Sequence, residues 1–406
     1  NRFFIDGGEM VVRGVAEEAV GRLSAKGGTG SGWKNQLVPK IPFDPEIFKL
    51  VLDEMVEEAG VHLYLYSHFA NAIRAKDRLR GVIIEDRTGR EAIEGSVTVD
   101  CTGDADVATR AGAPFEHNPP GSSSLEFRMA NVDLQRAYEF FKRNPERYPF
   151  DVDAPRSFGE FEWNWLENGF FYYPHGGGSR KGSNIAVLVE EAVGGGDYVK
   201  GFGLCSGLDA YGMDGLRASG TIIINSNFER INELDTRLMS KATCDARKAC
   251  FKAAGFLKDN LPGFENSFIV STAQELGVRV TRHIVGEHVL TREDANTKFF
   301  DVIGVGSTGF PGRPFEIPYR CMLPKKVEGL IVASGKAVST RPGGYLRGMT
   351  TCMVLGQAAG VAAALVAKQR ATARKIDVRG MQSELLSQKA YLGNGERLKG
   401  LDLSSP

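Results

Sequence analysis

The segment Val97–Asp106 most constrains how this chain can fold, because an apolar strand runs directly into a short polar turn. Its sequence is Val-Thr-Val-Asp-Cys-Thr-Gly-Asp-Ala-Asp. Glycine at position 103 lets the backbone turn or approach a ligand closely. Open α/β sheets bind ligands at the carboxyl ends of their strands. Thr102, Gly103 and Asp104 are therefore predicted neighbours of a cofactor, with a plain strand-ending turn as the alternative.

A second segment, Arg341–Leu365, places several glycines before a predicted helix. The N–H groups and the positive dipole end of that helix, near Gly348 to Thr351, would stabilise an anion. Tight helix packing alone is the alternative explanation for the small residues that share one face of the helix: Gly356, Ala359, Gly360 and Ala363.

A literal Gly-x-Gly-x-x-Gly pattern occurs at Gly304–Gly309. A dinucleotide-binding pattern of this kind must open a helix whose N-terminus holds the pyrophosphate. Pro311 and Pro314 follow at once, and two prolines so close prevent such a helix. We therefore reject the pattern as a dinucleotide site, and with it an NAD-dependent dehydrogenase built on these glycines.

Local patterns predict a coarse order of helices and strands. Asp44 and Pro45 suit the start of a helix that runs to Gly60, and its apolar stripe should pack on a sheet. Alternation and turn residues predict strands at about 61–66, 68–75, 79–86 and 91–100, the last three forming a β-meander. Further elements are predicted as helices near 228–259, 350–368 and 378–388 and a strand at 329–335.

Composition limits the classes of function. The chain has 406 residues with 42% hydrophobic composition, which suggests two or three domains. Its 50 basic and 50 acidic residues balance, so no overall field draws it to nucleic acid or to an anionic membrane, and a small ligand is expected. The apolar run Gly356–Ala367 is shorter than the ~20 residues of a membrane span. Six scattered cysteines and six dispersed histidines predict free thiols, a cytoplasmic location and no metal.

Two further stretches carry polar groups suited to substrate chemistry. His175 lies between the aromatic Phe171–Tyr173 and a glycine-rich cationic loop at 176–184, for which a solvated loop is the alternative. Arg279, Arg282 and His283 lie in a stretch of alternating polarity that continues to a helix start capped by Thr291. Arginine can bind a carboxylate and histidine can move a proton, although surface salt bridging is the alternative for each.

Taken in order, these segments resemble the FAD-dependent oxidoreductases whose flavin domain has the glutathione-reductase-type dinucleotide-binding fold. Four stretches carry the likeness and together cover most of the chain: Phe43–Glu46 with its helix, Val99–Ala108, Val278–Glu287 and Ile317–Gly360. The resemblance implies an α/β fold with FAD as cofactor. A Rossmann-like, FAD/NAD(P)-binding three-layer domain with a β-meander would comprise 1–115 and 316–406, and an inserted α+β substrate domain would comprise 116–315.

The resemblance also implies where the cofactor lies. The residues expected near the dinucleotide are Thr102, Gly103, Asp104 and Asp106, with Ser334, Gly335 and Lys336 also near the cofactor. Those expected to approach the isoalloxazine are Arg347, Gly348, Met349, Gly356, Gln357 and Gly360. The implied reaction is hydride transfer between a small polar substrate and flavin N5, with an unspecified electron acceptor. His175, Arg282 and His283 would orient the substrate or transfer protons.

One departure from the family pattern affects this interpretation. Such proteins begin with a strand, a Gly-x-Gly-x-x-Gly turn and a helix that bind the ADP half of FAD, and this chain lacks that unit after Asn1. We expect a truncated polypeptide, or a different partner chain that supplies the unit, and a homo-oligomer is a separate expectation. The alternative is a non-catalytic or cofactor-free subunit that keeps the flavoprotein fold.

Overall fold

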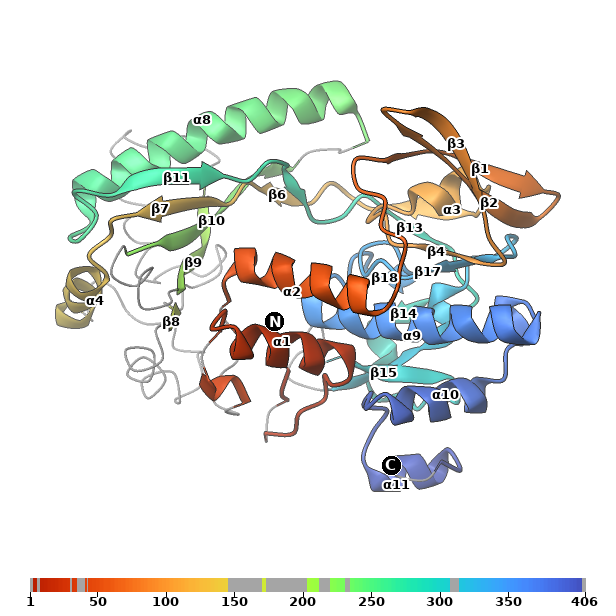
Figure 1. Cartoon of the computed structure of the whole chain (residues 1–406). Coiled ribbons are helices and arrows are strands. Elements are labelled where there is room, and N and C mark those ends of the chain that lie inside the picture. Colours follow the sequence, from red (N-terminus) through yellow and green to blue (C-terminus); the bar gives the residue numbers. More distant parts are fainter. Residues whose placement is uncertain are drawn as a thin grey trace. The chain divides into compact units, whose positions relative to one another are not determined.

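The computed structural model of the chain (Figure 1) describes residues 3–5, 8–29, 31–34, 41, 43–144, 170–172, 203–211, 220–230, 234–306 and 314–403. The chain divides into two compact units. The first comprises Asn1–Gly21, Leu52–Pro119 and Val280–Pro406, and the second comprises Arg22–Val51 and Pro120–Arg279. Both are discontinuous in sequence. The predicted functional domains, with limits at 115 and 316, stay a prediction.

The β-meander of the first unit follows the sequence prediction closely. β1 (His68–Ala75), β2 (Arg78–Asp86) and β3 (Gly89–Glu94) form an antiparallel sheet in that order. Asp86 stabilises the turn between β2 and β3, because its carboxylate accepts hydrogen bonds from the N–H and the hydroxyl of Thr88. The last predicted strand, 91–100, is divided between β3 and the separate strand β4 (Thr98–Asp100).

The parallel pairing of β4 with β17 (Leu330–Val332) joins two distant parts of the first unit. Thr98 pairs with Leu330 and Asp100 with Val332. Ile331 and Val332 are fully buried. Such buried parallel strands are typical of α/β folds, so the structure confirms a mixed α/β class. The three-layer arrangement and the inserted domain stay predictions.

Other strands of the first unit form short pairs. β5 (Phe115–His117) runs antiparallel to β13 (Arg282–Ile284), β14 (Leu290–Thr291) parallel to β18 (Thr340–Arg341), and β15 (Val302–Gly306) antiparallel to β16 (Phe315–Pro318). Short helical segments are α3 (Asp106–Arg110), η2 (Arg292–Asn296), η3 (Tyr319–Met322), η4 (Ala373–Lys375), α10 (Val378–Ser387) and α11 (Gly395–Gly400). Thr291 precedes η2 and donates to Asp294, so the predicted cap is present on a single 3-10 turn.

The rejected glycine pattern lies in and after β15. Gly304 and Gly306 belong to this strand, while Gly309 is outside the described residues. A Cβ at Gly304 would lie 2.3 Å from Val354 and one at Gly306 would lie 2.3 Å from the Phe315 ring. The two glycines therefore serve close packing, and they do not open a helix.

Helix α9 (Met349–Gln369) is the central helix of the first unit. Leu355, Ala358 and Ala362 are fully buried in the core cluster that also contains β17. Within the described residues, α9 is the one helix long and apolar enough to cross a membrane, since it begins seven residues before the apolar run at Gly356. Half of its apolar window is buried, and the core helices of globular proteins meet the same criteria.

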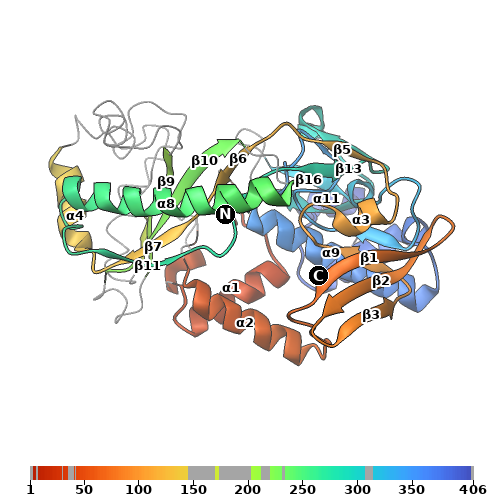
Figure 2. The ribbon, with the colours of Figure 1, turned by 90° about the horizontal axis from the view of Figure 1, so that it is seen from above.

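The second unit contains a long helix beside an antiparallel sheet, which Figure 2 shows from above. The described strands follow the order β11-β7-β10-β6-β12, with β9 also paired to β10 and β8 to β9. Their bounds are β6 (Ser122–Ser124), β7 (Phe127–Ala130), β8 (Phe170–Tyr172), β9 (Gly203–Tyr211), β10 (Ile222–Arg230), β11 (Phe268–Thr272) and β12 (Gly277–Val278). The helical elements of this unit are η1 (Ser31–Lys34), α4 (Leu134–Arg143) and α8 (Thr236–Asn260).

Packing between α8 and this sheet forms the second core. Phe127, Met129 and Ile222 of the strands are buried with Ala253 and Leu257 of the helix. The helix was predicted from about 228, but residues up to Arg230 belong to β10. The helix begins after Asp235, because this side chain accepts hydrogen bonds from the N–H groups of Arg237 and Leu238.

Three predictions near the N-terminal end need correction. Helix α1 (Val15–Ala25) was not predicted. Helix α2 (Pro45–Glu58) was, but of its apolar stripe Val51 alone is buried and Leu52 is exposed, so the expected burial on a sheet is wrong. Residues 61–66 form no strand, and Leu63 and Leu65 are more than half exposed. The alternating pattern there has no pairing strand among the described residues.

Candidate cofactor site

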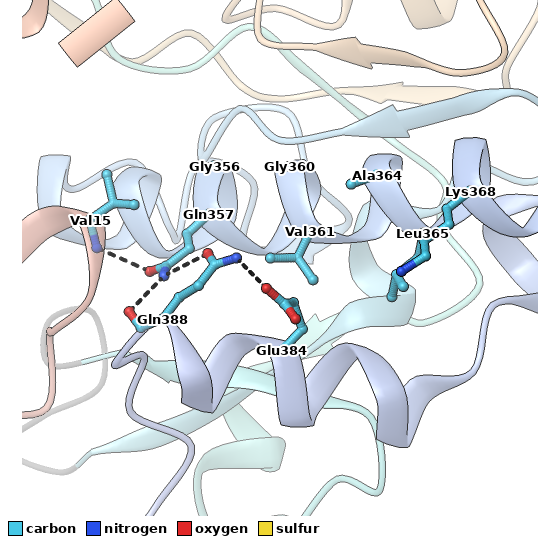
Figure 3. Close-up of a pocket in the computed structure, with 10 residues that line it drawn as sticks. All are labelled: Val15, Gly356, Gln357, Gly360, Val361, Ala364, Leu365, Lys368, Glu384 and Gln388. Carbon is cyan, nitrogen blue, oxygen red and sulfur yellow. Dashed lines mark hydrogen bonds between the residues drawn. The ribbon is translucent and has the colours of Figure 1, made fainter. Parts of the chain in front are cut away.

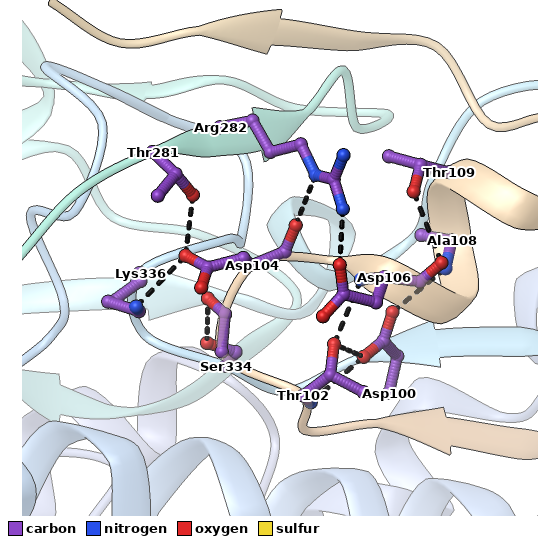
Figure 4. Close-up of polar contacts among 11 residues, drawn as sticks. Asp100, Thr102, Asp104, Asp106, Ala108, Thr109, Thr281, Arg282, Ser334 and Lys336 are labelled. Carbon is purple, nitrogen blue, oxygen red and sulfur yellow. Dashed lines mark hydrogen bonds and ion pairs between the residues drawn. The ribbon is translucent and has the colours of Figure 1, made fainter. Parts of the chain in front are cut away.

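The turn that follows β4 is built around one buried carboxylate (Figure 4). Asp100 is fully buried, and it accepts hydrogen bonds from the N–H and hydroxyl of Thr102 at 3.0 and 2.7 Å and from the N–H of Ala108 at 2.8 Å. The Thr102 hydroxyl in turn accepts from the N–H of Asp106 at 2.9 Å. Residues 102–108 are thus fixed as a single structure rather than left as a plain strand-ending loop.

Cationic side chains surround the acidic residues of this turn. Asp104 forms an ion pair with Lys336 at 2.9 Å and accepts a hydrogen bond from the Thr281 hydroxyl. Arg282 donates to the carbonyl of Asp104 at 2.6 Å and pairs with the carboxylate of Asp106. Burial raises the pKa of Asp106 above its ordinary value, while the neighbouring Arg282 acts to lower it. Segments that belong to or directly follow β4, β13 and β17 therefore meet at this turn.

Two glycines permit close approach of the backbones. Gly103 has a φ of 95°, which favours glycine, and its carbonyl accepts a hydrogen bond from the Ser334 hydroxyl at 2.9 Å. A Cβ at Gly335 would lie 2.1 Å from the Leu346 carbonyl oxygen and 2.8 Å from the Cys352 sulfur. The segment after β17 therefore contacts both the turn after β4 and the start of α9. The predicted cofactor residues 102–106 and 334–336 are brought together.

The N-terminus of α9 lies at the same end of β17. Gly348 is its N-cap, and no side chain within the described residues caps the first turn. Arg347 and Met349, on either side, are exposed. A helix end without a side-chain cap leaves N–H groups and the positive dipole end for an anion. The start of α9 is therefore a position where negative charge would be stabilised.

The remaining predicted residues lie farther along α9, where they line a cavity of about 520 Å³ (Figure 3). Gly356 and Gly360 are exposed on one face, and a Cβ on either would meet no atom within 4 Å. Gln357 accepts a hydrogen bond from the N–H of Val15 at 3.3 Å and donates to the Gln388 carbonyl at 3.3 Å. Of the predicted small face, Ala359 is buried instead. Residues 356–360 thus form a second cluster, centred more than two helical turns from Gly348.

His283 faces a different set of side chains from its neighbour Arg282. Its ring is 5% exposed, and Nε2 lies 3.4 Å from the Glu116 carboxylate. Both oxygens of Glu116 accept from Arg341, at 3.0 and 2.9 Å. Burial lowers the pKa of His283 below its ordinary value, while Arg341 lowers the pKa of Glu116. The pair is therefore a neutral imidazole beside a carboxylate at neutral pH.

The outcome for the other candidates is mixed. His175 and the loop 176–184 lie outside the described residues. Arg279 lies in the second unit, and its charge acts to lower the pKa of Glu126, which burial raises. The described cysteines are free thiols, as expected: Cys101, Cys244, Cys250, Cys321 and Cys352. No group of three or more potential metal ligands was found among the described residues.

Sequence analysis missed several residues that build the site. Asp100, Thr281 and Glu116 bind predicted residues, and Arg341 binds Glu116, yet only Asp100 carried a usable signal. The spacing Asp100-x-Thr102 repeats that of Asp86-x-Thr88, where an aspartate also accepts from the threonine N–H and hydroxyl. The other three partnerships join segments from about 160 to 230 residues apart.

The fold is of the mixed α/β class, and comparison identifies the family. The sequence matches the family described as FAD dependent oxidoreductase over residues 3–385. The chain therefore belongs to the FAD-dependent oxidoreductases, and FAD is its cofactor. No curated protein matches the sequence.

Solved structures show only distant likeness. A geranylgeranyl bacteriochlorophyll reductase-like protein from Thermoplasma acidophilum is 12% identical, with 88% of this chain and 62% of that chain covered at a TM-score of 0.36. The p-nitrophenol 4-monooxygenase of Pseudomonas putida is 8% identical, with 90% and 62% covered and a TM-score of 0.34. A flavin-dependent brominase variant is 9% identical, with 89% and 67% covered and a TM-score of 0.37. The chain thus spans less than two thirds of the first two proteins, and such low TM-scores decide neither fold nor reaction.

Proposed function

We propose that this oxidoreductase transfers a hydride between a small polar organic substrate and N5 of FAD. The observation that carries the proposal is the fixed turn Thr102–Asp106, which Lys336, Ser334 and Arg282 join to β17 and β13. Ligands of α/β proteins bind at such carboxyl ends of parallel strands. The turn, the glycine at 335 and the start of α9 together fit one elongated cofactor.

The residues of this chain would divide the binding of FAD between them. In the proposal, Gly103 lies beside the dinucleotide, and Gly335 lets the segment after β17 pack closely against Leu346, just before α9. Asp104 and Lys336 hold each other in place beside the cofactor. Gly348 and the first turn of α9 would bind the edge of the ring that becomes negative on reduction. When bound, FAD supplies the electron-accepting or electron-donating chemistry, while the protein orients the substrate.

The roles of the catalytic candidates follow from their contacts. Arg282 is engaged by Asp104 and Asp106, so we propose that it positions the turn instead of binding a substrate carboxylate. His283, a neutral imidazole, would accept or donate the substrate proton. His175 remains a proposed contributor to the substrate pocket. We also propose a cytoplasmic location, a homo-oligomer or else a different partner chain that supplies the ADP-binding unit, and an electron acceptor still to be identified.

Flavin content and its reduction test this function. The purified protein should absorb at about 450 nm through bound FAD that is released on denaturation. Lys336→Met should lower FAD retention, because it leaves Asp104 without its ion pair. Lys399→Met, at an exposed position of α11 in the same unit, is the matched control and should retain FAD. A colourless protein that FAD cannot reconstitute would reject the proposal in favour of a cofactor-free subunit.

A further inference from the structure

Seven buried side-chain polar atoms of the first unit have no hydrogen-bond partner within the described part of the chain, and two of the seven lie close to each other in the fold. These two are Nδ1 of His283 and Nδ2 of Asn118. An unpaired buried polar group costs about 1–3 kcal/mol, so such atoms usually indicate a bound water or ligand. One is a ring nitrogen and the other an amide donor, and both belong to the β5–β13 ribbon or its direct continuation.

Pairing along this ribbon places the two side chains on one face. His283 is the partner of Glu116, and the N–H of Asn118 donates to the Thr281 carbonyl at 2.7 Å. Because side chains alternate along a strand, Glu116, Asn118 and His283 share a face. His283 and Asn118 are diagonal neighbours on it, about 7–8 Å apart at the backbone.

The opposite face confirms this alternation. Phe115 and His117 contact each other there with ring centroids 5.3 Å apart. The Arg282 guanidinium lies 5.6 Å from the Phe115 ring centroid. His117 therefore belongs to the same ribbon as His283 but faces away from it, which makes it a matched control.

Glu116 determines which nitrogen of His283 carries the proton. The carboxylate lies 3.4 Å from Nε2 and is held by Arg341. A lone pair on Nε2 would be repelled by that negative charge, whereas an N–H is attracted to it. The neutral ring therefore carries its proton on Nε2 and has a lone pair on Nδ1. The unpaired atom of His283 is an acceptor.

The side-chain amide of Asn118 lies next to Gly343, which has no side chain. A Cβ at Gly343 would lie 2.0 Å from Oδ1 and 2.4 Å from Nδ2 of Asn118. The glycine thus provides the space that the amide occupies. Arg341 binds Glu116 and Gly343 adjoins Asn118, so one short segment lies against this face of the ribbon.

We propose that His283 Nδ1 and Asn118 Nδ2 bind the reacting hydroxyl of an alcohol substrate. A hydroxyl donates one hydrogen bond and accepts another, which matches one acceptor and one donor on the same face. The site is linked to the cofactor turn, because Thr281 and Arg282 both bind Asp104. This inference rests on the proposed function and names its substrate class.

The two side chains would complete the oxidation as follows. An alcohol that becomes a carbonyl compound loses one hydride from carbon and one proton from oxygen. The hydride and its two electrons are accepted by the FAD of the proposed function. The O–H bond breaks and its proton passes to Nδ1 of His283, where the Glu116 carboxylate stabilises the resulting imidazolium. Asn118 keeps donating to the same oxygen.

The test is anaerobic reduction of the FAD-loaded protein, followed at the flavin absorbance band. The probes are isopropanol, lactate and cyclohexanol, with isopropylamine, alanine and cyclohexylamine as amines of matching skeletons. At least one alcohol should reduce the flavin. His283→Gln should slow this by about 10²- to 10⁴-fold, and Asn118→Leu should slow it by about tenfold, as expected for one lost hydrogen bond. The control His117→Gln should not change the rate.

Nitrogen NMR of histidine-labelled wild-type protein measures the position of the ring proton directly, independently of any rate. The signals of His283, assigned by their loss in His283→Gln, should show the proton on Nε2 and respond at Nδ1 when the alcohol is added. Reduction by amines alone, a proton on Nδ1, or rates unaffected by both variants would overturn the inference. A flavin that dithionite reduces but no alcohol reduces would overturn it too while leaving the proposed function intact, whereas a protein without flavin would reject both.

Discussion

At the scale of single residues, the short pattern Asp-x-Thr has different consequences at Asp86 and at Asp100. Asp86 and Asp100 each accept hydrogen bonds from the N–H and hydroxyl of the threonine two residues later. Asp86 lies in an exposed hairpin turn, whereas Asp100 is fully buried and also accepts from the N–H of Ala108. Burial makes the loss of a hydrogen-bond acceptor more costly.

We therefore expect Asp100→Asn to destabilise the protein by about 1–3 kcal/mol, because the amide replaces one acceptor oxygen with a donor. The free energy of unfolding in urea measures this. Asp86→Asn is the matched control and should change stability much less. Equal decreases in the free energy of unfolding of the two variants would show that Asp100 does not organise the turn. FAD retention should fall with Asp100→Asn and not with Asp86→Asn.

The buried imidazole of His283 makes stability depend on pH. Its pKa is lowered from 6.5 by burial, so the unfolded chain binds a proton more readily between the two pKa values. The contribution of the neutral His283 ring to the free energy of unfolding is complete above pH 6.5, and it is lost as the pH falls through the lowered pKa. Glu116, whose own pKa is lowered mainly by its hydrogen bond with Arg341, contributes only at more acidic pH.

His283→Gln should consequently flatten the decline in the free energy of unfolding between about pH 7 and 5.5. Chemical denaturation at a series of pH values measures the slope. His117→Gln, which changes the histidine on the opposite face, should leave the slope as in the wild type. A decline of equal slope in all three proteins would mean that His283 is not the group responsible.

At the scale of elements, the open face of α9 permits a further test. Gly356 and Gly360 lie in the helix with nothing within 4 Å of an added Cβ. Gly360→Ala should thus stabilise the flavin-free protein by about 0.5–1 kcal/mol through helix propensity. If this face approaches the isoalloxazine, as the family resemblance implies, the same variant should weaken FAD binding.

Thermal unfolding with and without FAD, together with titration of FAD, separates these effects. Gly304→Ala is the informative contrast, since its Cβ would lie 2.3 Å from Val354 and should destabilise both forms. Unchanged FAD affinity in Gly360→Ala would mean that the isoalloxazine does not contact this face of α9.

Elements that depend on local chemistry were the ones that the sequence could predict. The helix after Asp44, the β-meander and α9 have their caps, turns and periodicity within their own residues. Residues 61–66 have strand periodicity, but a strand also needs a partner, and periodicity cannot supply one. The start of α8 was misplaced because residues up to Arg230 belong to β10, whose pairing with β6 depends on a segment about 100 residues away. Similarly, Glu116 and Arg341 could not be connected with His283, since their contacts depend on the tertiary fold.

At the scale of the whole molecule, FAD binding should stabilise the first unit and leave the stability of the second unit unchanged. Every predicted FAD residue lies in the first unit. FAD at 100 times its dissociation constant stabilises the unit that binds it by about 2.7 kcal/mol. Hydrogen exchange should therefore slow in residues 100–110 and 334–352 when FAD is added, and stay unchanged in α8 and β11.

Mass spectrometry of exchanged peptides measures this difference, with a flavin-free sample as control. Slower exchange confined to α8 and β11 would contradict the assignment of FAD to the first unit. Slower exchange of residues 356–365 in addition would support contact between the ring and the open face of α9.

The bond from Ser334 to the Gly103 carbonyl spans 231 residues, and this separation matters during synthesis. A ribosome makes both sides of the cofactor turn at different times, with almost the whole second unit translated between them. Until β17 leaves the exit tunnel, β4 has no parallel partner and its turn has neither Lys336 nor Ser334. Chains interrupted before that point cannot assemble the site. In the meantime the apolar strand β4 of the nascent protein stays uncovered, which exposes the protein to aggregation. Chaperones are therefore important for its production.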